Sequence, residues 1–115
     1  MTYEAFDVVA VPFPFTDAAT EKRRPALVVS SRVYFNDASG HSVMAMITSA
    51  KNKSWPLDVP LNDLTLTGLT APSVVRMKLF TLDHRFVIKK IGTLSAKDKR
   101  QVTKQLQALF GLLLD

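Results

Sequence analysis

Three cations precede the point where an apolar strand is expected to begin. Lys22, Arg23 and Arg24 come directly before Pro25, and an apolar run occupies residues 26–29. The residue before a proline is pushed toward extended backbone, so the Arg24 side chain starts from a better fixed position than that of an ordinary loop arginine. Such an arginine suits bidentate contact with a phosphate group. The alternative is that the cations are gatekeepers flanking a hydrophobic strand.

Two hydroxyl side chains and two further cations are placed where they can bind an anion. Thr48 and Ser49 end the apolar run of residues 43–47. Hydroxyls at a strand end can donate to phosphate oxygens, although they are also common turn residues. Arg76 and Lys78 are two residues apart in an expected strand, so both should point to one face. That face is either solvated or anion-binding.

Other classes of site find little support in the residue types. The chain has no cysteine, which excludes thiolate nucleophiles, thiolate metal sites and disulfides. Its two histidines, His41 and His84, lack metal-ligand spacing, and there is no acidic cluster for a hard cation. We therefore expect no metal and no cofactor. Several aromatic side chains are candidates for stacking a nucleobase, although most of the phenylalanines are better explained as core residues: Phe13, Phe15, Tyr34, Phe35, Trp55 and Phe80.

The composition is that of one small globular domain over residues 1–115. Apolar residues make up 47% and charged residues 22% of the chain. The net charge of +5 favours an anionic partner, of which nucleic acid is the commonest, although solubility alone is an alternative explanation. The sequence contains no apolar run long enough for a membrane span and no secretory signal. A cytoplasmic location without membrane association is the expectation.

The hydrophobic pattern predicts five or six short strands followed by one helix. Strands are expected over residues 7–15, 25–31, 42–49, 57–61, 73–82 and 86–94, with a turn or loop within 33–41 and a loop or single helical turn over 64–72. Residues 16–21 read as a polar loop. Pro12 and Pro14 indicate that the second half of the first strand lies at a sheet edge or leaves the sheet. Many short strands in one small domain predict a compact barrel.

The tail of the chain changes to a helical period. Ser95 and Asp98 have the spacing of a capping box. An apolar stripe then follows, and it predicts an amphipathic helix packed against the barrel: Val102, Leu106, Leu109, Phe110 and Leu113.

Four blocks of the sequence resemble the MazF/PemK toxin family in their order along the chain. They are DVVAVPFPFTD, KRRPALVVSS, MAMITS and PSVVRMKLFTLD, with the terminal helix after them. The resemblance implies an SH3-like barrel of five to seven strands with a C-terminal helix, which acts as a homodimer. It also implies the toxin of a type II toxin–antitoxin pair, with a cognate antitoxin, that cuts single-stranded RNA sequence-specifically without metal.

The resemblance assigns the catalytic roles to Arg24 and Thr48. RNA-binding roles are expected for the neighbouring cations and hydroxyl and for the pair in the later strand, namely Lys22, Arg23, Ser49, Arg76 and Lys78. Two departures stand out. Phe6 replaces the glycine that usually precedes the first strand, and Met77 or Lys78 occupies the place where some members carry an acid. Asp17 and Glu21 are then the nearest candidates, by sequence, for the general base.

The expected reaction is attack by a ribose 2′-hydroxyl on its own phosphate, which leaves a 2′,3′-cyclic phosphate and a free 5′-hydroxyl. Arg24 would stabilise the charge of the phosphorane, and Thr48 would hold a non-bridging oxygen. Two alternatives stay open. The same barrel resembles CcdB toxins, which bind gyrase and cleave nothing, and the missing acid also allows an RNA-binding barrel without catalysis.

Overall fold

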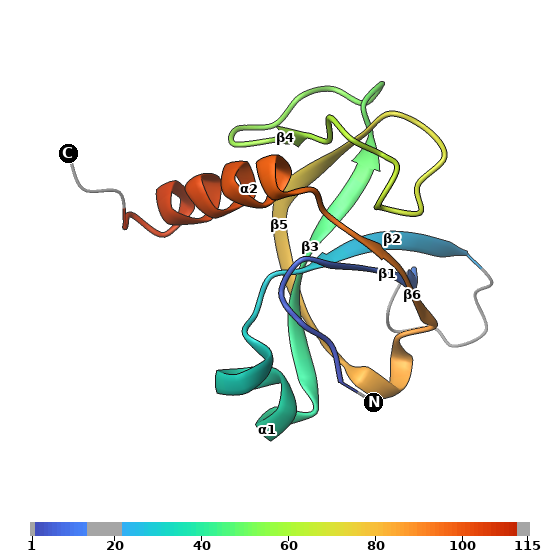
Figure 1. The fold of residues 1–115 in the computed structure, drawn as a ribbon, viewed down its shortest axis with the longest axis vertical. Coiled ribbons are helices and arrows are strands. Elements are labelled where there is room, and N and C mark those ends of the chain that lie inside the picture. Colours follow the sequence, from blue (N-terminus) through green and yellow to red (C-terminus); the bar gives the residue numbers. More distant parts are fainter. Residues whose placement is uncertain (1, 14–21, 113–115) are drawn as a thin grey trace.

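The strands form one curled antiparallel sheet. In the computed structural model, which describes residues 2–13 and 22–112, six strands pair in the order β4-β5-β3-β2-β1-β6 (Figure 1). The expectation of a small barrel of five to seven strands with a C-terminal helix is confirmed, the barrel being open between β4 and β6. The strands are β1 Asp7–Pro12, β2 Arg23–Val28, β3 His41–Ser49, β4 Val59–Pro60, β5 Ser73–Asp83 and β6 Lys89–Thr93.

Both faces of the central strands are buried, because successive side chains of a strand alternate between the faces. One apolar cluster joins the sheet to helix α2, Ala96–Leu109, and includes Val8, Leu27, Ala45, Ile47, Val75 and Val102. The other fills the opposite face and includes Tyr3, Val9, Ala26, Val28, Met44 and Leu82. The continuous apolar run after Pro25 is therefore explained by burial on two sides.

Strand β1 loses one neighbour near its end, as the prolines predict. It pairs with β2 as far as Pro12, opposite Arg23, but its pairing with β6 stops at Ala10. Beyond Ala10, β1 therefore has one partner strand, and a residue without an N–H group is tolerated there. The strand ends at Pro12, which is earlier than predicted. Pro14, Phe15 and the expected polar loop of residues 16–21 lie outside the described residues.

The expected turn within residues 33–41 is helical instead. A π-helix, Arg32–Asn36, continues into the short α1, Asp37–Ser39, and Gly40 ends it with a φ of 67°. Ser31 caps the segment by accepting a hydrogen bond from the Tyr34 N–H at 3.1 Å. The prediction missed this serine cap. Smaller differences are a 3-10 helix, His84–Phe86, before a shortened β6, and a β4 of only two residues.

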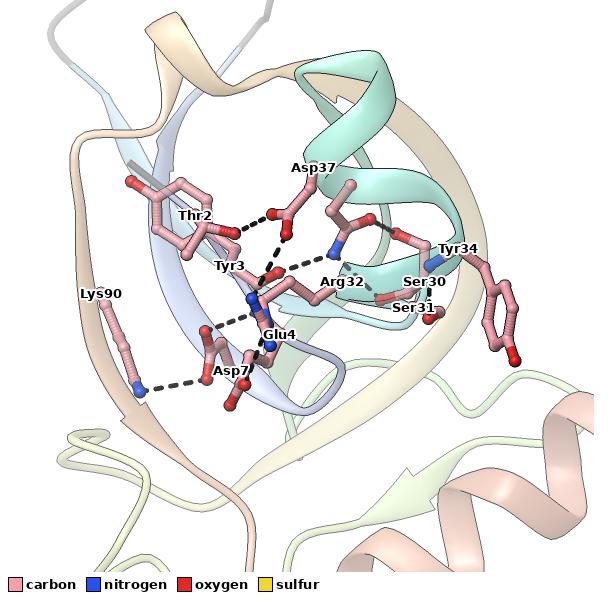
Figure 2. A network of polar contacts seen from close by, with 11 residues as sticks. Thr2, Tyr3, Glu4, Asp7, Ser30, Ser31, Arg32, Tyr34, Asp37 and Lys90 are labelled. Atoms are coloured by element: carbon pink, nitrogen blue, oxygen red, sulfur yellow. Dashed lines mark hydrogen bonds and ion pairs between the residues drawn. The ribbon is translucent and has the colours of Figure 1, made fainter.

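The N-terminal segment is fastened to this helical region and to β6 (Figure 2). The Thr2 hydroxyl donates to the Asp37 carboxylate. Arg32 bridges Glu4 and Asp37, with both nitrogen–oxygen distances at 3.2 Å, and Asp7 pairs with Lys90 at 3.1 Å. Arg32 and Asp37 come just before the first residues of β3, whereas Thr48 and Ser49 are its last residues. This polar network therefore lies at the opposite end of β3 from Thr48 and Ser49.

Helix α2 is capped as predicted but packs along only part of its length. The Ser95 hydroxyl accepts from the Asp98 N–H at 3.2 Å, while the buried Asp98 carboxylate accepts from Asn62 N–H instead of closing the capping box. Val102 is buried, whereas Leu109 and Phe110 are exposed. Figure 1 shows the last turns of α2 extending past the sheet, so the stripe predicted to pack does so only in its first half. Leu113 lies outside the described residues.

Candidate functional site

A cleft of about 350 Å³ opens where β2 begins and β3 ends. Arg24, Thr48 and Ser49 line it together, with Phe13, Pro25, Met46, Ile47, Asn52, Ala71, Pro72 and Ser73. The sheet register explains why these residues meet. Ala26 of β2 is paired with Met46 of β3. Arg24 lies two residues before Ala26 and Thr48 two residues after Met46, which is the same direction along this antiparallel pair. Both therefore share the face of Ala26 and Met46.

Arg24 presents its charge to this cleft. The residue is exposed, and its guanidinium carbon lies 5.8 Å from the centroid of the Phe13 ring. Within the described part of the chain, Arg24 forms no ion pair, in contrast to Arg32, Arg76 and Arg85. A guanidinium that is restrained by an aromatic ring, and that has no counter-charge among residues 2–13 and 22–112, is well suited to bind an incoming anion.

The Thr48 hydroxyl is oriented by a residue that the sequence prediction missed. Asn52 Nδ2 donates to Thr48 Oγ1 at 2.6 Å. Because the threonine oxygen accepts this bond, its own hydrogen remains available to donate to another oxygen in the cleft. Asn52 is brought back to the strand by a turn in which its N–H donates to the Ser49 carbonyl at 3.1 Å. The polar run after Ser49 was the only signal in the sequence.

The other polar groups of the cleft are two serines. Ser49 Oγ accepts from the Lys51 N–H at 3.2 Å, so its hydrogen is also available to donate. Ser73 donates to the Ala71 carbonyl at 2.9 Å and can offer only its oxygen to a ligand. The cleft therefore presents one fixed cation and two hydroxyl donors, which is the set of groups that a phosphate requires.

A second cleft, of about 330 Å³, adjoins the first on the far side of the Arg24-Pro25 step. Arg23 lines this second cleft, and Arg24, Pro25, Ala71 and Ser73 line both. Lys22 is exposed and lines neither of them. The cations predicted at the mouth of β2 are thus distributed over adjoining surfaces, and only Arg24 reaches the cleft that holds Thr48.

Arg76 and Lys78 share one face of β5, as predicted, but only Lys78 is exposed. Met77 between them is buried, and both cations contact Trp55, at 5.4 Å and 5.7 Å from the ring centroid. Arg76 is bound within the protein. Its guanidinium pairs with Asp58 at 3.0 Å and donates to the Lys53 carbonyl at 2.7 Å, and its side chain is only 13% exposed.

Asp58 supplies the acid beside Arg76 that β5 itself lacks. Burial opposes ionisation of Asp58, but hydrogen bonds from Arg76 and from the Trp55 N–H outweigh it and hold the pKa of the carboxyl below its ordinary value. The bond to Asp58 in turn raises the pKa of Arg76. Both groups are therefore charged at neutral pH. The sequence prediction did not single out Asp58, which comes from the loop before β4.

No acid lines the 350 Å³ cleft in the part of the chain that is described. Asp17 and Glu21, the predicted candidates for the general base, lie outside the described residues. Among residues 2–13 and 22–112, no group of three or more acidic or imidazole side chains could hold a metal ion. No helix in these ranges is long and apolar enough to span a membrane.

Comparison with known families identifies the family to which the chain belongs. Residues 4–110 match the model for the PemK-like, MazF-like toxins of type II toxin–antitoxin systems. The chain belongs to this family. It is therefore a type II toxin of the MazF/PemK class, and the CcdB alternative receives no support from the match. No curated protein sequence matches this toxin significantly.

Solved structures of MazF toxins share the fold of this MazF/PemK toxin over nearly its whole length. The MazE–MazF complex of Deinococcus radiodurans is 25% identical, with a TM-score of 0.75, and the match covers 98% of this chain and 99% of that one. The Mycobacterium tuberculosis toxin MazF-mt6 is 21% identical, with a TM-score of 0.73 and coverages of 94% and 99%. A mycobacterial endoribonuclease in complex with its cognate antitoxin is 18% identical, with a TM-score of 0.77 and coverages of 98% and 99%.

Proposed function

We propose that this MazF/PemK toxin is an endoribonuclease that cuts single-stranded RNA sequence-specifically without a metal cofactor, as an mRNA interferase does. The observation that carries the proposal is the meeting of Arg24 and Thr48 in one cleft, from two strands that are far apart in the sequence. Membership of the family and the endoribonuclease among the similar structures support the same activity.

The proposed reaction uses the substrate's own 2′-hydroxyl as the nucleophile. Its oxygen attacks the adjacent phosphorus while the bond from phosphorus to the 5′-oxygen breaks, giving a 2′,3′-cyclic phosphate. A base accepts the 2′-hydroxyl proton, and the leaving 5′-oxygen gains a proton. Arg24 stabilises the negative charge that grows on the non-bridging oxygens, where a preorganised donor is most effective.

Thr48 holds a non-bridging oxygen in this scheme, and Asn52 positions Thr48. The hydrogen bond from Asn52 fixes which way the threonine hydroxyl donates, so the cleft is organised before RNA arrives. Ser49 is a second hydroxyl donor to the same phosphate. The base remains assigned to Asp17 or Glu21 by their place in the sequence, since Asp58 is paired with Arg76 and does not line the cleft.

The remaining cations serve the RNA backbone. We assign phosphate contacts to Lys22, Arg23 and Lys78, which are all exposed. Arg76, expected beforehand to make such a contact, is better placed as a positioning residue because Asp58 and the Lys53 carbonyl already bind it. Contacts of this kind raise affinity in a salt-dependent manner without reading the base sequence.

The partners follow from the same surface. We propose a homodimer in the cytoplasm, with RNA lying along a groove shared by two copies, because a two-fold axis doubles the basic face of one small barrel. A cognate antitoxin with an acidic binding segment would cover that groove, given the net charge of +5. The similar structures include toxins bound to their antitoxins.

Incubation of the purified toxin with long RNA in excess EDTA tests the proposal. The expected result is a set of discrete fragments with 5′-hydroxyl and 2′,3′-cyclic phosphate ends. Binding of the RNA without fragments would identify a non-catalytic barrel, and inhibition of gyrase without RNA cleavage would identify a CcdB-like toxin. Either result would refute the nuclease assignment.

A further inference from the structure

Trp55 is held in place beside two cations, yet its ring remains accessible. The residue is 45% exposed, and Arg76 and Lys78 both contact the ring from β5. The backbone N–H of Trp55 donates to the Asp58 carboxylate at 2.9 Å. Asp58 pairs with Arg76, and Arg76 also donates to the Lys53 carbonyl. The loop is thus fastened to β5 two residues before the ring and three residues after it.

This ring lies on the same face of the sheet as the proposed catalytic cleft. Arg76 of β5 is paired directly with Met46 of β3, and Met46 lines the cleft two residues before Thr48. Directly opposed residues of an antiparallel pair share a face, as do residues two apart in one strand. The loop that carries Trp55 also carries Asn52, which is bonded to Thr48. The loop that carries the ring is therefore joined to the cleft near both of its ends. Asn52 is bonded to Thr48, and Asp58 is bonded to Arg76, which is paired with Met46.

An exposed aromatic ring beside cations matches the chemistry of an unpaired nucleotide. Aromatic side chains stack the flat faces of bases, and nearby cations attract the phosphates on either side. We propose that Trp55 is a stacking platform for a base of the bound single-stranded RNA, beside the nucleotides at the cleft, with Lys78 on an adjacent phosphate. This inference rests on the proposed function for the identity of the RNA.

Intrinsic fluorescence tests the platform directly, because Trp55 is the only tryptophan of the chain. The probe is a mixed-sequence, single-stranded 2′-O-methyl oligoribonucleotide, which lacks the attacking hydroxyl and is not cut. Titration should quench Trp55 emission with the same dissociation constant as an anisotropy measurement on the labelled oligonucleotide. The same oligonucleotide annealed to its complement should quench much less, since its bases are already stacked. Saturated binding without quenching would overturn the proposal.

Variants separate stacking from a merely structural role. Trp55→Ala should weaken binding by about 5- to 150-fold, which corresponds to the stacking of one base, and Trp55→Phe should retain most of the affinity. The loss in Trp55→Ala should be equal at low and high salt, whereas the loss in Lys78→Gln should shrink as salt rises. Wild-type affinity in Trp55→Ala, or a loss that disappears at high salt, would contradict the proposal.

Phe86→Ala is the matched control. Phe86 is 48% exposed and contacts Arg85 at 6.0 Å, but it follows the far end of β5. Its substitution should leave RNA affinity unchanged, and an equal loss there would mean that any exposed aromatic has the effect. Cleavage of long RNA is measured in parallel. A toxin that binds and quenches without cutting would refute the nuclease and leave the platform intact, whereas a toxin that cuts without quenching would refute the platform alone.

Discussion

Asn52 Nδ2 lies 2.6 Å from Thr48 Oγ1, and this bond leaves the threonine hydrogen directed away from Asn52. If the bond positions Thr48 for catalysis, Asn52→Ala should lower the cleavage rate by less than Thr48→Ala does. The double variant should then be no slower than Thr48→Ala alone, because Asn52 acts through the hydroxyl. Single-turnover rates on one RNA measure all three. Additive losses would show that Asn52 contacts the RNA by itself.

The Arg76–Asp58 pair predicts a pH-dependent difference in stability. Asp58 has a lowered pKa in the folded toxin, so the stability that it provides is present above the ordinary aspartate value and is lost as pH falls through the lower folded value. Asp58→Asn should therefore unfold at a lower temperature than the wild type at neutral pH. The two melting temperatures should converge in strong acid, and thermal melts across this range test the prediction. A difference in melting temperature that stays the same at every pH would mean that the charge of Asp58 does not stabilise the folded toxin.

Phe6 occupies a backbone position that favours glycine. Its φ is 75°, in the left-handed region that glycine adopts without strain. Phe6 packs partly against the core and contacts Lys99. Phe6→Gly and Phe6→Ala both lose this packing, but only the glycine variant removes the backbone strain of a positive φ. Phe6→Gly should be more stable than Phe6→Ala by about 1 kcal/mol, measured by chemical denaturation.

The neighbouring Ala5 provides the control for Phe6, because its φ is not positive. Ala5→Gly should destabilise by about 0.4–1 kcal/mol, because glycine gives the unfolded chain more conformational freedom to lose. If glycine were worse than alanine at Phe6 as well, the backbone there would not be strained.

His84 should make the stability of the toxin fall in mild acid. Burial, and to a smaller extent the charge of His41, lower the pKa of His84, whose ring bonds to the Ser42 hydroxyl at 2.7 Å. The unfolded chain then binds a proton at higher pH than the folded one, so stability is fully present above about pH 6.5 and declines below it. His84→Gln should flatten the unfolding free energy between about pH 7.5 and about pH 5.5 relative to the wild type. An unchanged slope would assign the acid sensitivity elsewhere.

Features that depend only on neighbours in the sequence are predictable from local signals. The Ser95 cap, the edge position of Pro12 and the shared face of Arg76 and Lys78 each follow from spacing alone. The cap at Ser31 has an equally local signal, but the Asn-Asp-Ala-Ser-Gly run that follows it favours a turn or loop.

Contacts between distant segments could not be predicted in the same way. Arg24 meets Thr48 through strand register, which no local pattern fixes, and only the resemblance to MazF/PemK toxins linked the two residues. Asp58 reaches Arg76 because the residue after it, Val59 of β4, is paired with Val75 of β5. Such pairings depend on how the sheet is assembled, and sequence spacing does not contain them.

The cleavage rate of Arg24→Ala tests the central claim most directly. Arg24 is exposed, so the variant should fold and melt as the wild type does. Its cleavage of long RNA in EDTA should fall by about 10²-fold or more, the effect of removing a preorganised charge donor. Thr48→Ala should lose less, and Thr48→Ser, which keeps the hydroxyl, should lose least. A folded Arg24→Ala variant that cuts RNA at close to the wild-type rate would contradict the account.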